Sequence, residues 1–241
     1  MTKLLSINAR REALSPKSQR RAEEILGTAR EVFSELGYEK TTTLEIAQRL
    51  GISEATVFTY FDSKRDLCMQ VISDWYDEIS KELEEELPHI QGTRVQLRYI
   101  VHKHLNALMR DGQGLCALVL TEGRIPNTEF SDLLTRLQRR YTAPLMTVLS
   151  AAQQAGEIRA DISLSMLRNM VYGSMEHMMW KYIISGETPE LKTNAHELTE
   201  LLWGAFAPPQ PDVEALRQLK MELFAAVNRF NITSENHKKD G

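Results

Sequence analysis

Residues 42–64 read TTLEIAQRLGISEATVFTYFDSK, a stretch that predicts two short helices joined by a tight turn, with a third helix starting directly after them. Thr42 and Glu45 have the spacing of a capping box, in which each side chain satisfies a free backbone N–H group at a helix start. We expect the first helix to run from Thr43 to Leu50. It should end at Gly51, because a residue without a Cβ readily takes the left-handed conformation of a C-cap.

The second short helix is predicted over Glu54 to Tyr60, with Ser53 as its N-cap. Ala47 is small where this helix must cross the first one, and Val57 faces the angle between them. The outer face is then free to enter a DNA major groove, which admits one α-helix. These residues predict a helix-turn-helix, although an ordinary pair of antiparallel helices is the alternative for this pattern alone. The outward residues are Ser53, Ala55, Thr56, Thr59 and Tyr60.

Two runs of sequence make this prediction more specific. ATVFTYFDSKRDL (55–67) places aromatic residues before a Ser–Lys pair, and ILGTAREVFSELGY (25–38) carries Phe33 and Gly37. Both runs resemble the TetR family of transcriptional repressors, specifically across about residues 18–70 and only in architecture beyond. The resemblance implies an all-α fold, with an N-terminal three-helix DNA-binding head and a helical body for ligand binding and dimerisation.

Carried over position by position, the resemblance implies three contacts to DNA phosphates, from Thr42, Thr43 and Lys64. Phe58 departs from the pattern, because a tyrosine is usual there and its hydroxyl would be lost. Glu54 stands where lysine is common; we expect it to be solvated at the helix N-terminus, where negative charge is favourable, with a cytosine contact as the alternative. The whole predicted DNA-binding set is Thr42, Thr43, Ser53, Ala55, Thr56, Phe58, Thr59, Tyr60 and Lys64.

One such head touches few bases, so useful affinity requires two heads about one helical turn apart. The expected partner is therefore double-stranded DNA with a palindromic operator, bound by a homodimer.

Composition bounds the fold class and the compartment. Twelve glycines and eight prolines in 241 residues favour long helices over a fold of strands and turns. Cys68 and Cys116 cannot form a disulfide framework, and we expect both to be buried free thiols in a reducing cytosol. The chain shows neither a signal segment nor an apolar run of about 18 residues. We therefore expect a soluble cytoplasmic protein with no membrane contact.

Charge and proline positions divide the chain into four predicted segments. Residues 1–16 form a basic flexible arm suited to phosphate or minor-groove contacts, with a plain solvated terminus as the alternative. Residues 17–66 form the helix-turn-helix domain, and residues 67–207 form the ligand-binding and dimerisation domain. Residues 208–241 hold a Pro-rich break, an extra amphipathic helix over 212–230 and a disordered tail. That extra helix is not a usual element of the family.

Apolar periodicity predicts the remaining helices. The 163–185 helix is apolar on every side, so one side must face a partner. The resemblance implies a four-helix dimer interface there, for which we predict Met166, Gly173, Trp180, Leu202 and Phe206. The predicted helices are 17–36, 64–87, 93–109, a buried helix near 115–122, 129–155 with a kink at Pro144, 163–185 and 189–206.

Methionines concentrate in the core helices of the body, where their flexibility suits a cavity for an apolar ligand. Ordinary core filling is the alternative, and for His177 a core or interface role is the alternative. The runs at 145–163 and 169–183 resemble the family branch that senses fatty acyl-coenzyme A, and drug-like hydrophobic effectors are the rival. The predicted pocket residues are Trp75, Met109, Tyr141, Met170, His177 and Met178.

Catalytic signatures are missing from the sequence. It contains no glycine-rich phosphate loop, no Gly-x-Ser-x-Gly and no CxxC pair, and His102 and His104 point apart on a helix. We predict no catalytic residue, no metal and no cofactor. The predicted function is a transcriptional repressor that an effector releases from its operator by a population shift. A protein–protein adaptor with a purely structural helix-turn-helix, or a helical enzyme, are the alternatives.

Overall fold

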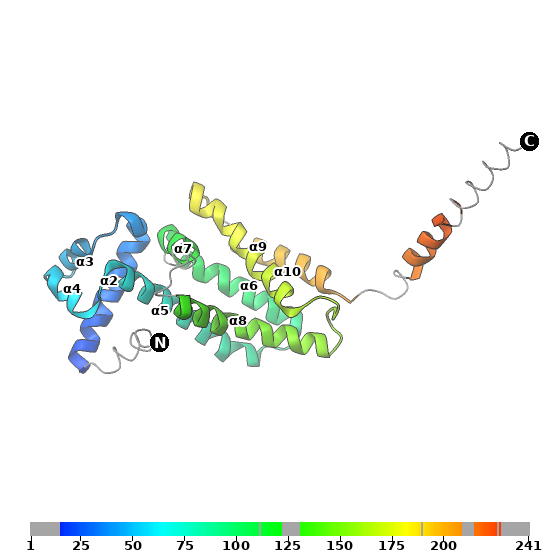
Figure 1. Ribbon diagram of the computed structural model, residues 1–241, viewed down its shortest axis with the longest axis horizontal. Coiled ribbons are helices and arrows are strands. Elements are labelled where there is room, and N and C mark those ends of the chain that lie inside the picture. The colour runs from blue at the N-terminus through cyan, green and yellow to red at the C-terminus, as the bar shows by residue number, and fades with distance from the viewer. Residues whose placement is uncertain are drawn as a thin grey trace, which may run out of the picture.

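The computed structural model describes residues 15–110, 112–121, 131–188, 190–208, 215–225 and 227. Every regular element in these residues is a helix, which confirms the predicted all-α class. Figure 1 shows a head of three helices at one end and a longer helical body beside it. The predicted basic arm lies almost wholly outside the described residues.

The head consists of α2 (Pro16–Lys40), α3 (Thr43–Arg49) and α4 (Glu54–Tyr60). The predicted caps are present: Thr42 Oγ1 accepts from the Glu45 N–H at 3.1 Å, and Ser53 Oγ accepts from the Thr56 N–H at 3.2 Å. The Glu45 carboxylate does not complete the capping box but accepts from Arg49 at 2.9 Å. Gly51 takes the predicted left-handed turn with φ of 64°.

Gly37 interrupts α2 with φ of 73° and ψ of 171°, at the point where the sequence predicts the helix to end. The chain beyond it turns back toward α3. The three helices close over a fully buried apolar core, to which Val57 contributes from α4. Its members are Ile25, Ala29, Val32, Phe33, Ile46, Ala47 and Val57.

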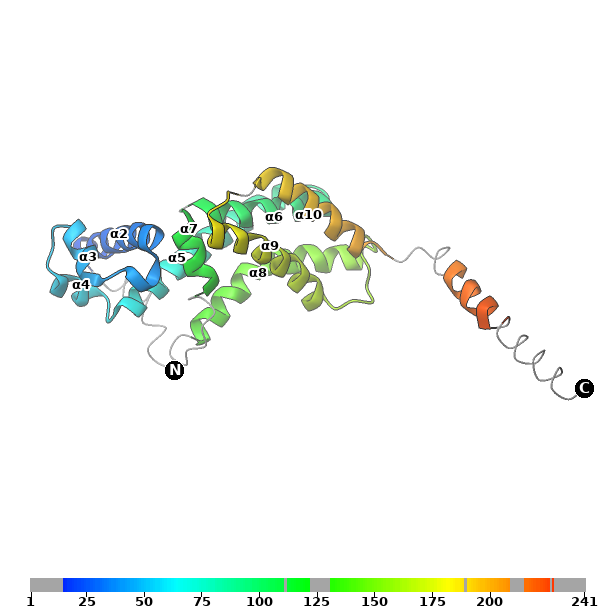
Figure 2. The same cartoon turned by 90° about the horizontal axis from the view of Figure 1, so that it is seen from above.

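The body begins with α5 (Lys64–Glu86), which starts in the head and ends in the short turn η1 (Leu87–His89). Figure 2 shows α6, α8, α9 and α10 running beside one another along the body. α10 packs on α6, and α8 packs on α5 and α9. The other helices are α6 (Thr93–Arg110), α7 (Gly112–Thr121), α8 (Ser131–Gln154, continuous through Pro144), α9 (Leu164–Ser185) and α10 (Leu191–Phe206).

The head joins the body through two contacts of α2, one with α5 and one with α7. Arg30 on α2 forms a two-pronged ion pair with Glu78 on α5, at 2.6 and 3.2 Å. Gly114 on α7 lies against the end of α2 so closely that a Cβ there would stand 2.6 Å from the carbonyl oxygen of Phe33. A body helix therefore touches the head backbone directly.

Beyond the body, the chain forms a C-terminal helix whose described residues are 215–225 and 227, which agrees with the helix predicted over 212–230. Figures 1 and 2 show this helix standing apart from the body. The rest of the predicted C-terminal segment from 209 onward lies outside the described residues. In the part of the chain that the structure describes, no helix is long and apolar enough to cross a membrane.

Candidate DNA interface and effector cavity

The outer face of α4 carries the residues predicted to enter the groove. Ser53, Ala55 and Thr59 are exposed, and Thr56 and Tyr60 are half-buried. The hydroxyls of Ser53 and Thr56 lie 2.8 Å apart, and Thr59 Oγ1 donates to the Ala55 carbonyl at 3.0 Å. The oxygen atoms of these hydroxyls can still accept hydrogen bonds from a ligand. Phe58 is 47% exposed on the same helix, so it presents an apolar ring to solvent instead of filling the core.

Thr42 and Thr43 stand at the start of α3, but they differ in access. Thr42 is exposed, whereas Thr43 is buried and donates its hydroxyl to the Glu54 carboxylate at 2.5 Å. Glu54 is half-buried in this contact, which corrects the expectation that it is simply solvated. The pair ties α3 to α4, and the Thr43 hydroxyl proton is engaged inside the head.

Lys64 also makes contacts that sequence reasoning missed. Its Nζ donates to the carbonyls of Tyr38 and Thr41 at 2.8 and 3.0 Å, and it lies 4.2 Å from the centroid of the Tyr38 ring. An ammonium group has three donors, so one remains for a phosphate. The side chain of Lys64, which is predicted to contact a DNA phosphate, is thus held by carbonyls at the turn between α2 and α3.

A cavity of about 470 Å³ opens between α8 and α9, with part of its wall from α5. Three tyrosines form its aromatic wall, and their neighbouring ring centroids lie 5.2 Å apart for Tyr76 and Tyr141 and 5.1 Å apart for Tyr141 and Tyr172. Arg139 and Arg168 add two guanidinium groups to the lining. The other lining residues are Thr135, Gln138, Thr142, Asn169, Gly173 and Glu176.

Behind the tyrosines lies a buried polar and aromatic cluster. Trp75 Nε1 donates to the Ala107 carbonyl at 3.2 Å, and a ring nitrogen of His104 is hydrogen-bonded to the Tyr141 hydroxyl. Burial raises the pKa of Tyr172 well above its ordinary range, so that phenol stays neutral. The cluster packs against the aromatic wall of the cavity, through Trp75 on Tyr141 and His104 on Tyr172.

The cavity contains one of the six residues predicted to line it, Tyr141. Trp75 lies behind Tyr141, and the centroids of these two rings are 5.9 Å apart. Met109 and Met178 are half-buried against the core, whereas Met170 and His177 are exposed on α9 and do not line this cavity. A contact of these four residues with an effector stays a prediction. Sequence reasoning missed Tyr76, Tyr172 and both arginines. Only the position of Tyr76 beside Trp75 could have suggested one of them.

The outer side of α9 is an exposed stripe with steps of three and four residues. Trp180 and Ile184 are 37% and 81% exposed although they are large and apolar. On α10, Leu202 and Phe206 are buried in the core of the single chain, at 4% and 1% exposure, which corrects their prediction as interface residues. Leu201 is the outward residue, at 72%. The stripe on α9 comprises Met166, Met170, Gly173, His177, Trp180 and Ile184.

The two cysteines are buried free thiols, as predicted. Burial raises the pKa of Cys116 to about 12, so its thiol stays protonated and poorly reactive. Among the described residues, no three side chains of the histidine, cysteine, aspartate and glutamate types gather into a metal-binding group.

Comparison with known proteins follows the division into head and body. Residues 25–71 match the bacterial regulatory proteins of the tetR family, and residues 73–205 match the C-terminal region of the YsiA-like proteins. The chain is 23% identical over 179 residues to the fatty acid metabolism regulator protein of Bacillus subtilis (strain 168), which covers 74% of this chain and 92% of that protein.

A second relative is the HTH-type transcriptional repressor KstR2 of Rhodococcus jostii (strain RHA1), 25% identical over 152 residues, or 63% of this chain and 74% of that one. Among solved structures, the transcriptional regulator FadR from Bacillus subtilis in complex with stearoyl-CoA has a TM-score of 0.68 at 22% identity, covering 75% of this chain and 96% of that chain. With both its helix-turn-helix head and its helical body matched, the chain belongs to the TetR family of bacterial transcriptional regulators.

Proposed function

We propose that this regulator is a homodimeric repressor that leaves a palindromic operator when a long-chain fatty acyl-coenzyme A occupies the cavity between α8 and α9. It acts in the bacterial cytosol on double-stranded DNA and carries out no catalysis of its own. The observation that carries the proposal is the composition of the cavity, which combines an aromatic wall with two arginines. One wall residue, Tyr76, belongs to α5, the helix that leads into the head.

The cavity suits an amphipathic anion better than a wholly apolar molecule. The tyrosine wall offers apolar surface to an acyl chain, while Arg139 and Arg168 can pair with phosphate oxygens through charge-assisted hydrogen bonds. A volume of about 470 Å³ is within the usual range of ligand pockets, roughly 300–1,000 Å³. The comparison with FadR supports this ligand class, since that structure is described with stearoyl-CoA.

For the operator, we assign α4 to the major groove, with Thr56, Thr59 and Tyr60 toward bases. Thr42 and the remaining donor of Lys64 then contact phosphates at the starts of α3 and α5. Phe58 lies on the exposed side of α4 and can contact a thymine methyl or the sugar backbone. Thr43 supports this surface from inside, through its hydrogen bond to Glu54.

For the dimer, we assign the exposed stripe of α9 together with the outward side of α10 around Leu201. A helix that exposes Trp180 and Ile184 along one continuous stripe needs a second apolar surface to cover it. Gly173 in the middle of the stripe permits close approach of a partner helix.

Coupling between cavity and head follows from the shared elements. An effector that displaces Tyr76 moves α5, and α5 is tied to α2 by the Arg30–Glu78 pair. A second route runs from α9 to α7, which packs on α9 and touches the end of α2 at Gly114. A ligand shifts the head only if it binds the released state more tightly than the operator-bound state.

Binding of the effector is tested by titrating the protein with stearoyl-CoA, coenzyme A and stearate while recording tryptophan fluorescence, since Trp75 lies against Tyr141. We expect saturable binding of stearoyl-CoA in the micromolar range or tighter, with weaker binding of the two fragments. Arg168→Gln should weaken stearoyl-CoA binding at least about tenfold, the loss of one charge-assisted contact, and leave stearate unchanged. Arg159→Gln is the control, because Arg159 is a half-buried arginine that pairs with Asp161 and does not line the cavity. Equal loss in both variants, or no binding at all, would reject this effector class.

A further inference from the structure

An apolar groove of about 320 Å³ lies where the end of α5 and η1 meet the middle of α8. Leu83, Leu87 and Val148 form its buried floor, and Ala143 and Thr147 form an exposed rim. The one charged residue in the lining is Glu84, on the last turns of α5. Two nitrogens of the Arg140 guanidinium approach the Glu84 carboxylate, each at 3.4 Å, a long distance that leaves acceptor capacity on the carboxylate.

The C-terminal helix (described residues 215–225 and 227) has the matching amphipathic pattern. Every described side chain in it is exposed, including large apolar ones at 52–74%. Its apolar stripe contains one cation, Lys220, whose Nζ lies 6.0 Å from the centroid of the Phe224 ring. An exposed stripe of this size normally marks an interaction surface. The apolar members of the stripe are Leu216, Leu219, Leu223, Phe224 and Val227.

We propose that the C-terminal helix docks into this groove of its own chain, with Leu216 and Leu223 on the apolar floor and Lys220 beside Glu84. The complement is both apolar and electrostatic: one cation in the stripe of the helix meets the one anion in the groove. Docking would hold the end of α5 against α8, and it would bury the apolar surface of both the groove and the C-terminal helix.

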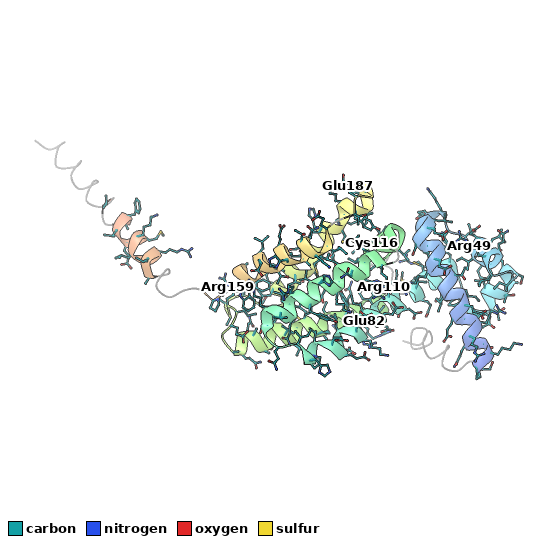
Figure 3. The ribbon with its side chains drawn as sticks, turned by 180° about the vertical axis from the view of Figure 1, so that it is seen from behind. Arg49, Glu82, Arg110, Cys116, Arg159 and Glu187 are labelled. Atoms are coloured by element: carbon teal, nitrogen blue, oxygen red, sulfur yellow. The ribbon has the colours of Figure 1, made fainter. Side chains whose placement is uncertain are left out.

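The chain is long enough for this arrangement. α10 ends at Phe206, whose carbonyl accepts from the Arg159 N–H at 2.7 Å, just beyond the end of α8. Figure 3 shows Arg159 at the end of the body from which the chain leads to the C-terminal helix. Val148 lies about 9 Å back along α8, at 1.5 Å per residue. The eight residues 207–214 can span up to about 26 Å, which exceeds this distance along α8 and leaves length for the crossing from α10 to the groove.

Charge favours the groove over pairing of two C-terminal helices. In a parallel pair, two copies of Lys220 would face each other within the apolar seam, which is destabilising. In the groove the same lysine gains an acidic neighbour. The proposal requires neither DNA nor effector, so it stands or falls separately from the proposed function.

Disulfide trapping tests the proposal directly on the full-length protein. With cysteines introduced as Thr147→Cys and Leu223→Cys, mild oxidation should give an intrachain cross-link that runs at monomer mass on a denaturing gel. The matched control keeps Thr147→Cys and places the second cysteine on the polar side of the helix, Gln218→Cys. We expect the cross-link yield to be at least several-fold higher for the first pair. The native Cys68 and Cys116 are buried and should contribute no background.

Other outcomes of this test overturn the proposal. A cross-link at dimer mass would place the helix in the groove of another copy, and a cross-link of Leu223→Cys alone would show pairing of two C-terminal helices. Equal yields for the test and control pairs would mean that the helix does not dock.

Hydrogen–deuterium exchange is a second test of docking that needs no introduced cysteines. Truncation after Pro208 should raise amide exchange several-fold in residues 83–90 and 143–148 and leave α2 to α4 unchanged. Ala143→Glu, which blocks the exposed rim, should reproduce that increase in 83–90 in the full chain. No change in either variant would contradict docking.

Discussion

Lys64 makes internal contacts where the head meets α5, in addition to its proposed contact with a DNA phosphate. Its ammonium group bonds two carbonyls at the end of α2 and packs on the Tyr38 ring, so it holds the turn that sets the angle of α3. A lysine that only met phosphates would leave folding untouched when replaced. The two roles can therefore be separated by measuring unfolding and DNA binding on the same variants.

For Lys64→Met we expect a loss of about 1–2 kcal/mol in the free energy of unfolding, because two carbonyls lose a charged donor. Urea unfolding followed by circular dichroism measures this loss. Lys81→Met is the control, because the Lys81 side chain is exposed and lies as far as 3.9 Å from its one ion-pair partner on the same helix, Glu85. This substitution should leave the free energy of unfolding nearly unchanged. If Lys64→Met unfolds like the wild type, the internal role is wrong.

Glu82 links α5 to α6 through Lys103 at 3.1 Å and Arg110 at 3.2 Å; Figure 3 shows Glu82 and Arg110 close together in the body. Partial burial acts to raise the pKa of Glu82, but the hydrogen bond from Lys103 and the charges of Lys103 and Arg110 outweigh it and hold the pKa below its ordinary value. A lowered carboxyl pKa stabilises the fold above the unfolded value, about 4.3. That stabilisation is lost as the pH falls through the lowered folded value.

We therefore expect Glu82→Gln to lower the free energy of unfolding by roughly 0.5–1 kcal/mol at pH 7. The difference from wild type should begin to shrink as the pH falls below the unfolded value, about 4.3, and should vanish once the pH is below the lowered folded value, where the wild-type side chain is neutral as well. Urea unfolding at pH 7, 5 and 3 measures it. A difference that stays constant with pH would show that packing, and not the ion pair, accounts for the effect.

At the scale of the elements, α7 is a body helix that packs directly on the head. Gly114 allows its backbone to lie against the carbonyls of Phe33 and Ser34 at the end of α2. A methyl group there would meet backbone atoms, which cannot rotate away. Because of this close approach, we expect α7 to transmit displacements between the body and α2, beside the route through α5.

Gly114→Ala should therefore push α7 from α2, lower stability by about 1–3 kcal/mol as overpacking does, and reduce the effect of the effector on operator affinity. Gly27→Ala, inside α2 with open space around a Cβ, is the control and should be neutral or stabilising by about 0.4–1 kcal/mol. Thermal unfolding and operator affinity with and without effector decide the outcome. If the effector lowers the operator affinity of a folded Gly114→Ala protein as much as that of the wild type, α7 does not transmit the effect of the effector to the head.

Sequence reasoning succeeded for the elements whose cause is local. The caps at Thr42 and Ser53 and the turn at Gly51 depend on a few neighbouring residues, so their positions agree with the structure. The partners of Thr43 and Lys64 come from other helices, and spacing along the chain could not show them. Local pattern also failed to orient α10, where Leu201 and Leu202 are adjacent and only packing on α6 decides which faces inward.

At the scale of the whole molecule, the account depends on assembly through α9 and α10. Leu201→Glu should shift the protein from dimer to monomer at micromolar concentration and keep its helical content, because that side chain is 72% exposed in the single chain. Leu202→Ala should instead lower the free energy of unfolding by about 2–5 kcal/mol, the usual result of truncating a buried leucine. Light scattering after size-exclusion chromatography and urea unfolding separate the two. A dimeric Leu201→Glu protein would place the interface elsewhere.

The measurement that tests the central claim most directly is fluorescence-anisotropy binding to DNA from upstream of the chain's own gene, at two salt concentrations, with and without stearoyl-CoA. We expect tight, sequence-selective binding that weakens steeply with salt as phosphate contacts require, that Tyr60→Ala reduces, and that stearoyl-CoA reverses. Binding no stronger than to a scrambled duplex, followed by an empty selection for bound genomic fragments, would contradict the repressor account.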